Sequence, residues 1–241
     1  MTDKISERIP SAERREQILE AASRVFGERG YFGATTDQIA KAAGISQPYV
    51  VRMFGGKENL FVGVLSRSLD RLLVAFTRTL EEWKAEGSPA APTGAVVADG
   101  TPVAGGHGEI GRRLGLAYVN LIEDRGLLLS LMQAFSMGQD PTIGAKARDG
   151  FLAIYRLLRD EAGFTPEQVR SFLAEGMLLN TLLGLRLPDE YGRDEAATEL
   201  LECTFRTKLA LVLDVAAESG GGVAVSSAAS VPVATAKAQG A

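Results

Sequence analysis

The side chains that could carry out covalent or metal chemistry in this sequence are few and far apart. The only histidine, His107, lies in a Gly- and Pro-rich stretch, 85–108, and the only cysteine, Cys203, is far along the chain. A metal site or a Cys–His nucleophile would need partners close by in a structured context. The acidic pairs at 123–124 and 160–161 consist of adjacent residues, which point to different faces of a helix. The sequence therefore predicts no catalytic residue, no metal site and no cofactor, and it argues against an enzyme.

Non-covalent recognition is available instead to a group of polar and aromatic residues near position 50. Val50 and Phe54 are four residues apart, so both are expected to face inward from one short helix. This leaves an amide, a phenol, a guanidinium and a thioether on the outer side of that helix. These outer residues are Gln47, Tyr49, Arg52 and Met53. Since the first three can form hydrogen bonds, the pattern predicts a binding surface.

Two short helices joined by a tight turn must position these side chains. The first helix is expected to begin at Thr35 or Thr36, whose hydroxyl can cap it. It ends before Gly44, where a left-handed backbone has little steric cost. Ser46 is expected to cap the second helix, and Pro48 lies in its first turn, where a missing N–H is harmless. Two helices joined by a Gly-containing turn, the second with polar residues outward, describe a helix-turn-helix.

Further residues of a known pattern flank this motif on both sides. The matching residues are Ile18, Ala21, Ala22, Phe26, Gly30, Thr35, Thr36, Ile39, Ala40, Ala43, Gly44, Ser46, Phe54, Lys57, Glu58 and Leu60. With them, the stretch from about 12 to 65 resembles the tetracycline-repressor (TetR) family of bacterial transcriptional regulators. Beyond this stretch only the length and the helical pattern of the chain agree with the family.

The resemblance implies an all-α fold, with an N-terminal three-helix DNA-binding domain and a C-terminal helical domain for ligand binding and dimerisation. Apolar periodicity, capping residues and helix breakers predict the helices. They are expected at about 12–29, 35–43, 46–54, 57–84, 109–123, 125–137, 142–162, 165–186 and 193–217. The expected divisions are a disordered arm at 1–10, a DNA-binding domain at 11–56, a regulatory domain at 57–217 with a mobile insertion at 85–108, and a disordered tail at 218–241.

The resemblance also implies that the helix starting near Ser46 lies in the major groove of double-stranded DNA. Gln47 can bond an adenine or a phosphate, Arg52 a guanine or a phosphate, and Tyr49 a thymine methyl or a phosphate. Thr36 and Lys57 match family positions that usually hold phosphates. The complete implied set of DNA-binding residues is Thr35, Thr36, Ser46, Gln47, Pro48, Tyr49, Arg52, Met53 and Lys57.

Several of these positions have another interpretation. Val51 stands where the family usually has a tyrosine that contacts the DNA backbone, and Met53 where a histidine or tyrosine is common. Phosphate anchoring then falls more on Tyr49, Arg52 and Lys57. Thr35 is better explained as a simple helix cap, and Lys57 fits a solvated surface lysine as well as it fits a phosphate contact.

A symmetric dimer that reads an inverted-repeat operator is a further implication, because one recognition helix contacts only a few base pairs. The family forms its dimer face from the last two helices, which here are expected at 165–186 and 193–217. The predicted interface residues are Phe172, Met177, Leu201, Phe205, Leu209 and Val212. The alternative is that these apolar stripes face the domain's own core.

The C-terminal domain of the family usually holds a small ligand between its helices. The predicted ligand-binding residues are Leu116, Asn120, Met132, Phe135, Phe151, Tyr155 and Asn180. Walls of aromatic and methionine side chains suit a lipophilic molecule. For any one of these residues, an ordinary core position is the better explanation, although a buried amide such as that of Asn180 needs a partner.

The bulk composition is compatible with this interpretation. The net charge is −4, but residues 1–67 carry +2 and the remainder carries −6, which places the positive end at the helix-turn-helix. No apolar run approaches the about 20 residues that cross a bilayer, and the single cysteine fits the cytoplasm. The alternative function is a helical interaction protein that has lost specific DNA binding. The outer residues Gln47, Tyr49 and Arg52 argue against that alternative.

Overall fold

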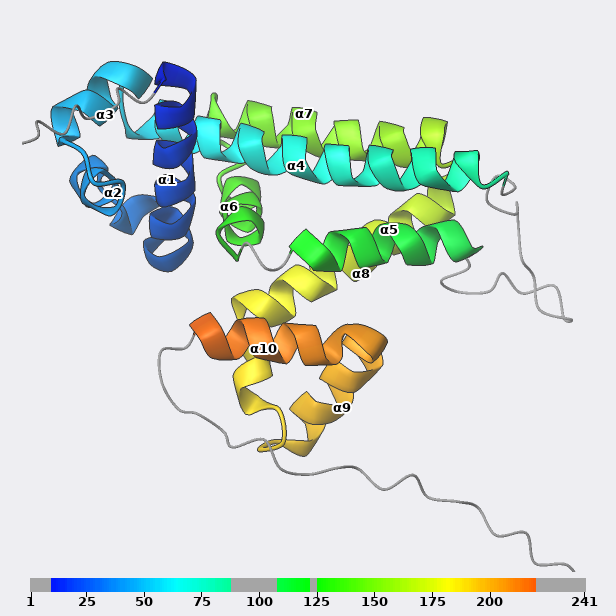
Figure 1. The fold of residues 1–241 in the computed structure, drawn as a ribbon. Coiled ribbons are helices and arrows are strands. Elements are labelled where there is room, and N and C mark those ends of the chain that lie inside the picture. Colours follow the sequence, from blue (N-terminus) through cyan, green and yellow to red (C-terminus); the bar gives the residue numbers. More distant parts are fainter. Residues whose placement is uncertain (1–9, 88–107, 122–124, 220–241) are drawn as a thin grey trace, which may run out of the picture.

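The computed structural model describes residues 10–87, 108–121 and 125–219, and these residues form helices and no strand. The α-helices, labelled in Figure 1, are α1 (Ser11–Gly33), α2 (Thr36–Ala42), α3 (Gln47–Phe54), α4 (Lys57–Ala85), α5 (Gly108–Asn120), α6 (Arg125–Ser136), α7 (Ile143–Arg156), α8 (Pro166–Gly184), α9 (Glu195–Phe205) and α10 (Leu209–Ser219). Three short helical segments are interposed: a π-helical one, η2 (Leu157–Glu161), and two 3-10 helices, η3 (Leu187–Glu190) and η4 (Arg206–Lys208). The predicted all-α fold is confirmed.

The predicted arm at 1–10, insertion at 85–108 and tail at 218–241 lie wholly or mostly outside the described residues. Of the helices that the structure describes, none is both long enough and apolar enough to cross a membrane.

The first three helices pack around a small aromatic core together with the start of α4. Phe26 of α1 meets Phe61 of α4 edge to face, with ring centroids 4.9 Å apart, and both side chains are fully buried. Tyr31 packs on the same cluster, 5.0 Å from Phe61. Edge-to-face pairs of this kind add to the energy of burial. This core holds α2 and α3 in place against α1 and α4.

The long helix α4 runs from this core through the rest of the molecule (Figure 1). Its inward stripe continues from Leu60 through Leu69 to Leu80, all nearly fully buried. The helix α7 lies alongside it, and Gly150 lets the two approach, because a Cβ at that position would collide with Leu69. One rigid helix therefore belongs to both ends of the protein.

A second connection between the two ends is the contact of α1 with α6. Gly126 lies directly on Ser23, so that a Cβ at Gly126 would be 2.6 Å from the Ser23 carbonyl oxygen. Nε2 of Gln133 donates a hydrogen bond to the carbonyl oxygen of Phe26 over 2.8 Å. Close packing through glycine leaves no room for either helix to move alone.

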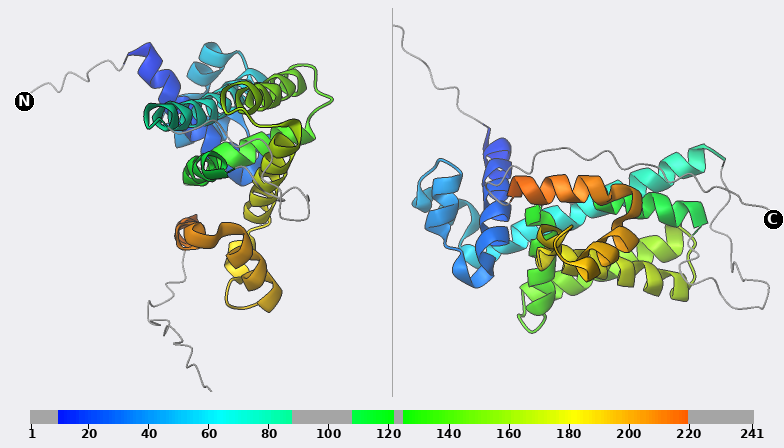
Figure 2. Two further views of the ribbon diagram at one scale, coloured as in Figure 1. Left: turned by 90° about the vertical axis from the view of Figure 1, so that its right-hand side faces the viewer. Right: turned by 90° about the horizontal axis from the view of Figure 1, so that it is seen from below.

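The single helix expected at 193–217 is wrong. The chain breaks at Arg206, which has φ 47 and ψ −118, and forms α9, η4 and α10. The break lets both α9 and α10 pack against η3 and against each other, which one straight helix could not do. Figure 2 shows these two helices at the edge of the molecule away from α4 and α7.

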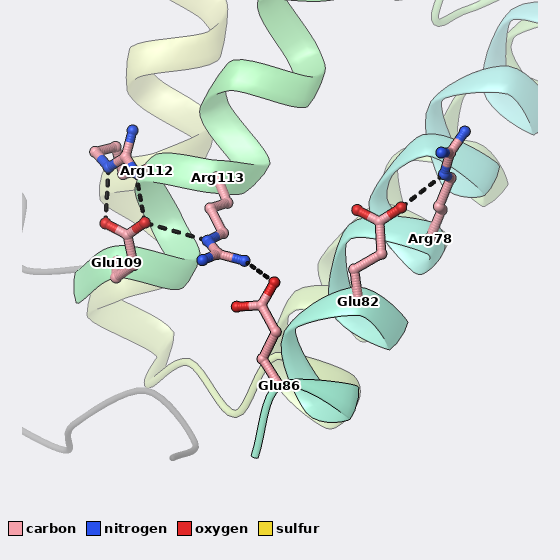
Figure 3. Close-up of polar contacts among 6 residues, drawn as sticks. All are labelled: Arg78, Glu82, Glu86, Glu109, Arg112 and Arg113. Atoms are coloured by element: carbon pink, nitrogen blue, oxygen red, sulfur yellow. Dashed lines mark hydrogen bonds and ion pairs between the residues drawn. The ribbon is translucent and has the colours of Figure 1, made fainter. Parts of the chain in front are cut away.

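An ion-pair network joins the end of α4 to the start of α5 (Figure 3). The guanidinium of Arg113 bonds Glu86, the residue directly after α4, over 2.9 Å and Glu109 over 3.1 Å. Arg112 bonds Glu109 as well, and Arg113 also stacks on Trp83. The network therefore joins the end of α4 to the start of α5.

Candidate nucleic-acid interface

The start of α2 is held by a reciprocal cap at Thr35. The Gln38 amide donates to the Thr35 hydroxyl over 3.2 Å, and the Thr35 amide donates to Oε1 of Gln38 over 3.0 Å. Thr35 was one of two candidates for this cap, and the structure selects it. Its hydroxyl and amide are thus engaged within the protein, as a capping box requires.

The turn between α2 and α3 forms as predicted. Gly44 has φ 66, a left-handed conformation that favours glycine. The amide of Ile45 donates to the carbonyl oxygen of Ala40 over 3.0 Å and closes the turn. Ser46 occupies the N-cap position of α3, but its hydroxyl makes no capping bond; Pro48 lies in the first turn.

The inner and outer faces of α3 are those predicted. Val50 and Phe54 are buried, whereas Arg52 and Val51 are exposed. Tyr49 and Met53 are half-buried and pack partly on the core. The guanidinium carbon of Arg52 lies 4.9 Å from the centre of the Tyr49 ring, so the two side chains form one stacked pair.

Two residues that are predicted to contact phosphates or bases form a hydrogen bond with each other in the free protein. Nε2 of Gln47, the first residue of α3, donates to Oγ1 of Thr36, the first residue of α2, over 3.2 Å. Sequence reasoning named both residues separately and missed their contact.

Lys57, at the start of α4, is partly committed to its own domain. Its Nζ donates to the carbonyl oxygen of Ala34 over 3.3 Å and lies 4.7 Å from the centre of the Tyr31 ring. Burial, followed by the charges of Glu58 and Asp140, raises the pKa of the Tyr31 phenol. The neutral ring therefore remains a platform for the ammonium group. A structural role for Lys57 is present, and its phosphate contact stays a prediction.

A cavity of about 80 Å³ lies between α4, α5, α6, α7 and α8. Three of the predicted ligand residues, Phe135, Phe151 and Asn180, line it. Four do not: Leu116, Met132 and Tyr155 are half-buried elsewhere, and Asn120 is exposed and accepts a hydrogen bond from Lys208. These four positions share the amphipathic pattern but lie on other sides of their helices.

The cavity also has a wall that sequence reasoning missed. Leu72 and Phe76 of α4 line it, as do Leu131 and Ile154. Helical spacing alone does not distinguish Leu72 and Phe76 from the other buried residues of α4. Their place there means that α4 touches both the cavity and the N-terminal helices.

Two buried polar groups in the cavity wall satisfy each other. The hydroxyl of Tyr118 donates to Oδ1 of Asn180 over 2.7 Å, and both residues are nearly fully buried. Burial raises the pKa of the Tyr118 phenol to about 12, against a smaller opposing effect of the Asn180 bond. The partner that a buried Asn180 required is thus a tyrosine of the same chain.

Most of the predicted dimer residues are buried within the single chain. Phe172 packs edge to face on Phe76, with centroids 5.8 Å apart. Leu201, Phe205 and Val212 are nearly fully buried, Leu209 is half-buried, and Met177 lines the cavity. These positions fit the alternative that the stripes face the chain's own core. The exposed leucines nearby are Leu178, Leu185 and Leu200.

Known proteins resemble this chain chiefly in the helix-turn-helix region. Residues 18–64 match the family model described as bacterial regulatory proteins, tetR family. The transcriptional activator FasR of Mycolicibacterium smegmatis is 44% identical over 73 residues, which are 30% of this chain and 33% of its own length. The transcriptional repressor AcnR of Corynebacterium glutamicum is 41% identical over 58 residues, 24% of this chain and 31% of its own length.

A solved structure extends the likeness of fold to most of the chain. The TetR-like transcriptional regulator from Rhodococcus sp. RHA1 matches with a TM-score of 0.51 and 20% identity, over 90% of this chain and 100% of that one. The chain spans about a third of the length of the curated relatives it matches. The helix-turn-helix region of this chain, residues 18–64, is thus that of the tetR family of bacterial regulatory proteins.

Proposed function

We propose that the protein is a DNA-binding transcriptional regulator that reads its operator with the outer face of α3. The observation that carries this proposal is the arrangement of Gln47, Tyr49 and Arg52 on the side of α3 opposite the buried Val50 and Phe54, with Arg52 exposed and the other two half-buried. An α-helix fits the major groove of B-form DNA, where amide and guanidinium groups distinguish the base pairs. The matching relatives are themselves named transcriptional regulators.

The proposed reading unit is a homodimer on an inverted repeat. Leu178 of α8 and Leu185, the residue directly after α8, lie seven residues apart and are 41% and 70% exposed. Together with Leu200 of α9 they supply apolar surface that the described chain leaves uncovered. A two-fold symmetric pair is the usual way in which soluble proteins cover such a surface.

The cavity is the proposed site of a small lipophilic ligand. Its volume of about 80 Å³ is well below the roughly 300 Å³ or more of typical ligand pockets, so binding would have to widen it. Widening would push on Leu72 and Phe76 and hence on α4, whose other end carries the DNA-reading helices. A ligand shifts the protein only by its difference in affinity for the two shapes.

Repression relieved by the ligand is the proposed mode of action, with residues 11–56 reading DNA and 57–217 responding to the ligand. Relatives include both an activator and a repressor, so a reporter assay on the selected operator, with and without the protein, tests the sign.

The decisive experiment is a selection of bound fragments from a random duplex library at near-physiological salt. Enrichment of an inverted repeat supports sequence-specific, dimeric binding, and its spacing measures the distance between half-sites. Binding that is only salt-sensitive, with no preferred sequence, would instead support a helical interaction protein that has lost specific DNA binding.

A further inference from the structure

Thr36 and Gln47, eleven positions apart, join the starts of the two helices of the helix-turn-helix. Nε2 of Gln47 donates to Oγ1 of Thr36 over 3.2 Å, in a half-buried place. The contact depends on the turn at Gly44, whose left-handed backbone brings the first turn of α3 against the first turn of α2. It thus belongs to the tertiary structure of the motif and not to either helix alone.

The bond decides which hydrogen-bonding groups Gln47 can present outward. A glutamine amide has one accepting oxygen and two N–H donors. With one N–H engaged by Thr36, the oxygen and the second N–H remain. This acceptor–donor pair complements the N6 amino group and N7 of adenine in the major groove. Holding the side chain in advance also reduces the entropy that binding must remove.

Thr36 is available for this role because its neighbour caps the helix. The hydroxyl and amide of Thr35 both bond Gln38, so the start of α2 is satisfied without Thr36. The Thr36 hydroxyl accepts from Gln47 and keeps its own hydrogen, which it can donate elsewhere.

We propose that Thr36 is a positioning residue for sequence reading, because it holds the Gln47 amide in the orientation that selects adenine. The inference rests on the proposed function, DNA binding through α3. It adds that the preference at one base pair of each half-site depends on a residue outside the recognition helix. A phosphate contact by Thr36 alone would affect all sequences equally.

The test measures base preference with the full-length protein. Wild type, Thr36→Val, Thr36→Ser, Gln47→Ala and the double variant Thr36→Val/Gln47→Ala are titrated with the duplex that wild type selects, and with the same duplex changed at each base pair in turn. Gln47→Ala should abolish the preference for adenine at one base pair. Thr36→Val, which has nearly the same shape but no hydroxyl, should reduce that preference about tenfold. Thr36→Ser should keep it.

The double variant tests whether Thr36 affects base preference through Gln47. If Thr36 acts through Gln47, then Thr36→Val has no further effect on base preference once Gln47 is alanine. Thr77→Val removes an exposed hydroxyl of α4 and is the matched control, expected to bind as wild type does. Thermal melting of each variant shows that it is folded, and Thr36→Ala replaces Thr36→Val if valine lowers the melting temperature.

The failures of the two proposals are distinct. Uniform weakening by Thr36→Val on every duplex, or additive effects of Thr36→Val and Gln47→Ala, would overturn the positioning role and leave DNA binding standing. Loss of preference for a base other than adenine in Gln47→Ala would overturn the assignment of the base. If wild type enriches no sequence at all, the proposed function fails and the positioning role fails with it.

Discussion

Arg52 is an exposed residue of the reading surface, and it stacks on the half-buried Tyr49. The Tyr49 ring lies under the guanidinium, 4.9 Å from its carbon, and limits the directions in which it can point. A planar guanidinium can bond both O6 and N7 of guanine, which lysine cannot imitate. Arg52→Ala should therefore cost about 1–3 kcal/mol of binding to the selected duplex, and Arg52→Lys should lose most of the same preference. Titration of duplexes changed at single base pairs measures this.

Variants of Tyr49 distinguish its role in supporting Arg52 from a contact of its own with DNA. Tyr49→Phe keeps the ring under Arg52 and should keep the guanine preference, whereas Tyr49→Ala should relax it. An equal loss of affinity for every sequence in Arg52→Ala would assign Arg52 to a phosphate instead.

The Tyr118–Asn180 hydrogen bond in the cavity wall should stabilise the folded protein. Tyr118→Phe leaves the buried Asn180 oxygen without its partner and should lower the free energy of unfolding by about 1–3 kcal/mol. Tyr118→Phe combined with Asn180→Leu should recover part of this loss, because neither polar group then remains. Denaturant titration measures both variants, and an unchanged midpoint in Tyr118→Phe would contradict the argument.

The same bond has a dependence on pH of known sign. The pKa of Tyr118 is raised from 10.0 to about 12, so the folded protein holds this proton more tightly than the unfolded chain does. The stabilisation is complete below pH 10 and is lost as the pH rises through about 12. The difference in stability between wild type and Tyr118→Phe should shrink over this range.

At the scale of helices, the contact of α1 with α6 leaves no space for a side chain at Gly126. A methyl group at Gly126 would press on Ser23, so Gly126→Ala should destabilise the protein by about 1–3 kcal/mol despite the better helix propensity of alanine. Gly115→Ala is the matched control, since a Cβ there meets nothing within 4 Å. That substitution should be neutral or stabilising. Thermal unfolding measures the stability of both variants. Equal midpoints for Gly126→Ala and Gly115→Ala would show that α1 and α6 can separate.

The network between α4 and α5 should make this junction sensitive to acid. Hydrogen bonds from Arg112 and then Arg113 lower the pKa of Glu109 from 4.5 to about 2. A lowered pKa means that the stabilisation is present above pH 4.5 and is lost as the pH falls toward about 2. The melting temperature of wild type should therefore fall more steeply over this range than that of Glu109→Gln.

Glu81→Gln removes one charge at an exposed glutamate of α4, outside the network, and serves as the control. Added salt should reduce the difference between wild type and Glu109→Gln, because the network is exposed and screened. Parallel acid profiles of the two proteins would mean that the network does not contribute to stability.

For the whole molecule, the proposed dimer depends on Leu178 of α8 and on Leu185, the residue directly after α8. Leu185 is 70% exposed, so a charge there would not disturb the core of one chain but would be placed in an apolar interface. Leu185→Glu should shift the protein toward monomer in sedimentation experiments and weaken binding to an inverted repeat more than to a half-site. Val74→Glu, at a 67% exposed position of α4, is the control. An unchanged dimer in Leu185→Glu would place the interface elsewhere.

The sequence by itself determined the features that depend on residues a few positions apart. The left-handed turn at Gly44 and the inward pair Val50 and Phe54 both follow from local backbone conformation and helical spacing. The helix-turn-helix, the assignment of its outer face and the family could therefore be predicted without coordinates.

Only the tertiary structure decided which surfaces meet. Helical spacing shows that a stripe is apolar, but it does not show whether the stripe packs on its own chain, lines a cavity or meets a partner. For this reason Leu201 and Phe205 were predicted at an interface and lie in the core, and four predicted ligand residues lie away from the cavity. The break at Arg206 and the bond between Thr36 and Gln47 likewise depend on packing between helices, which no local sequence rule contains.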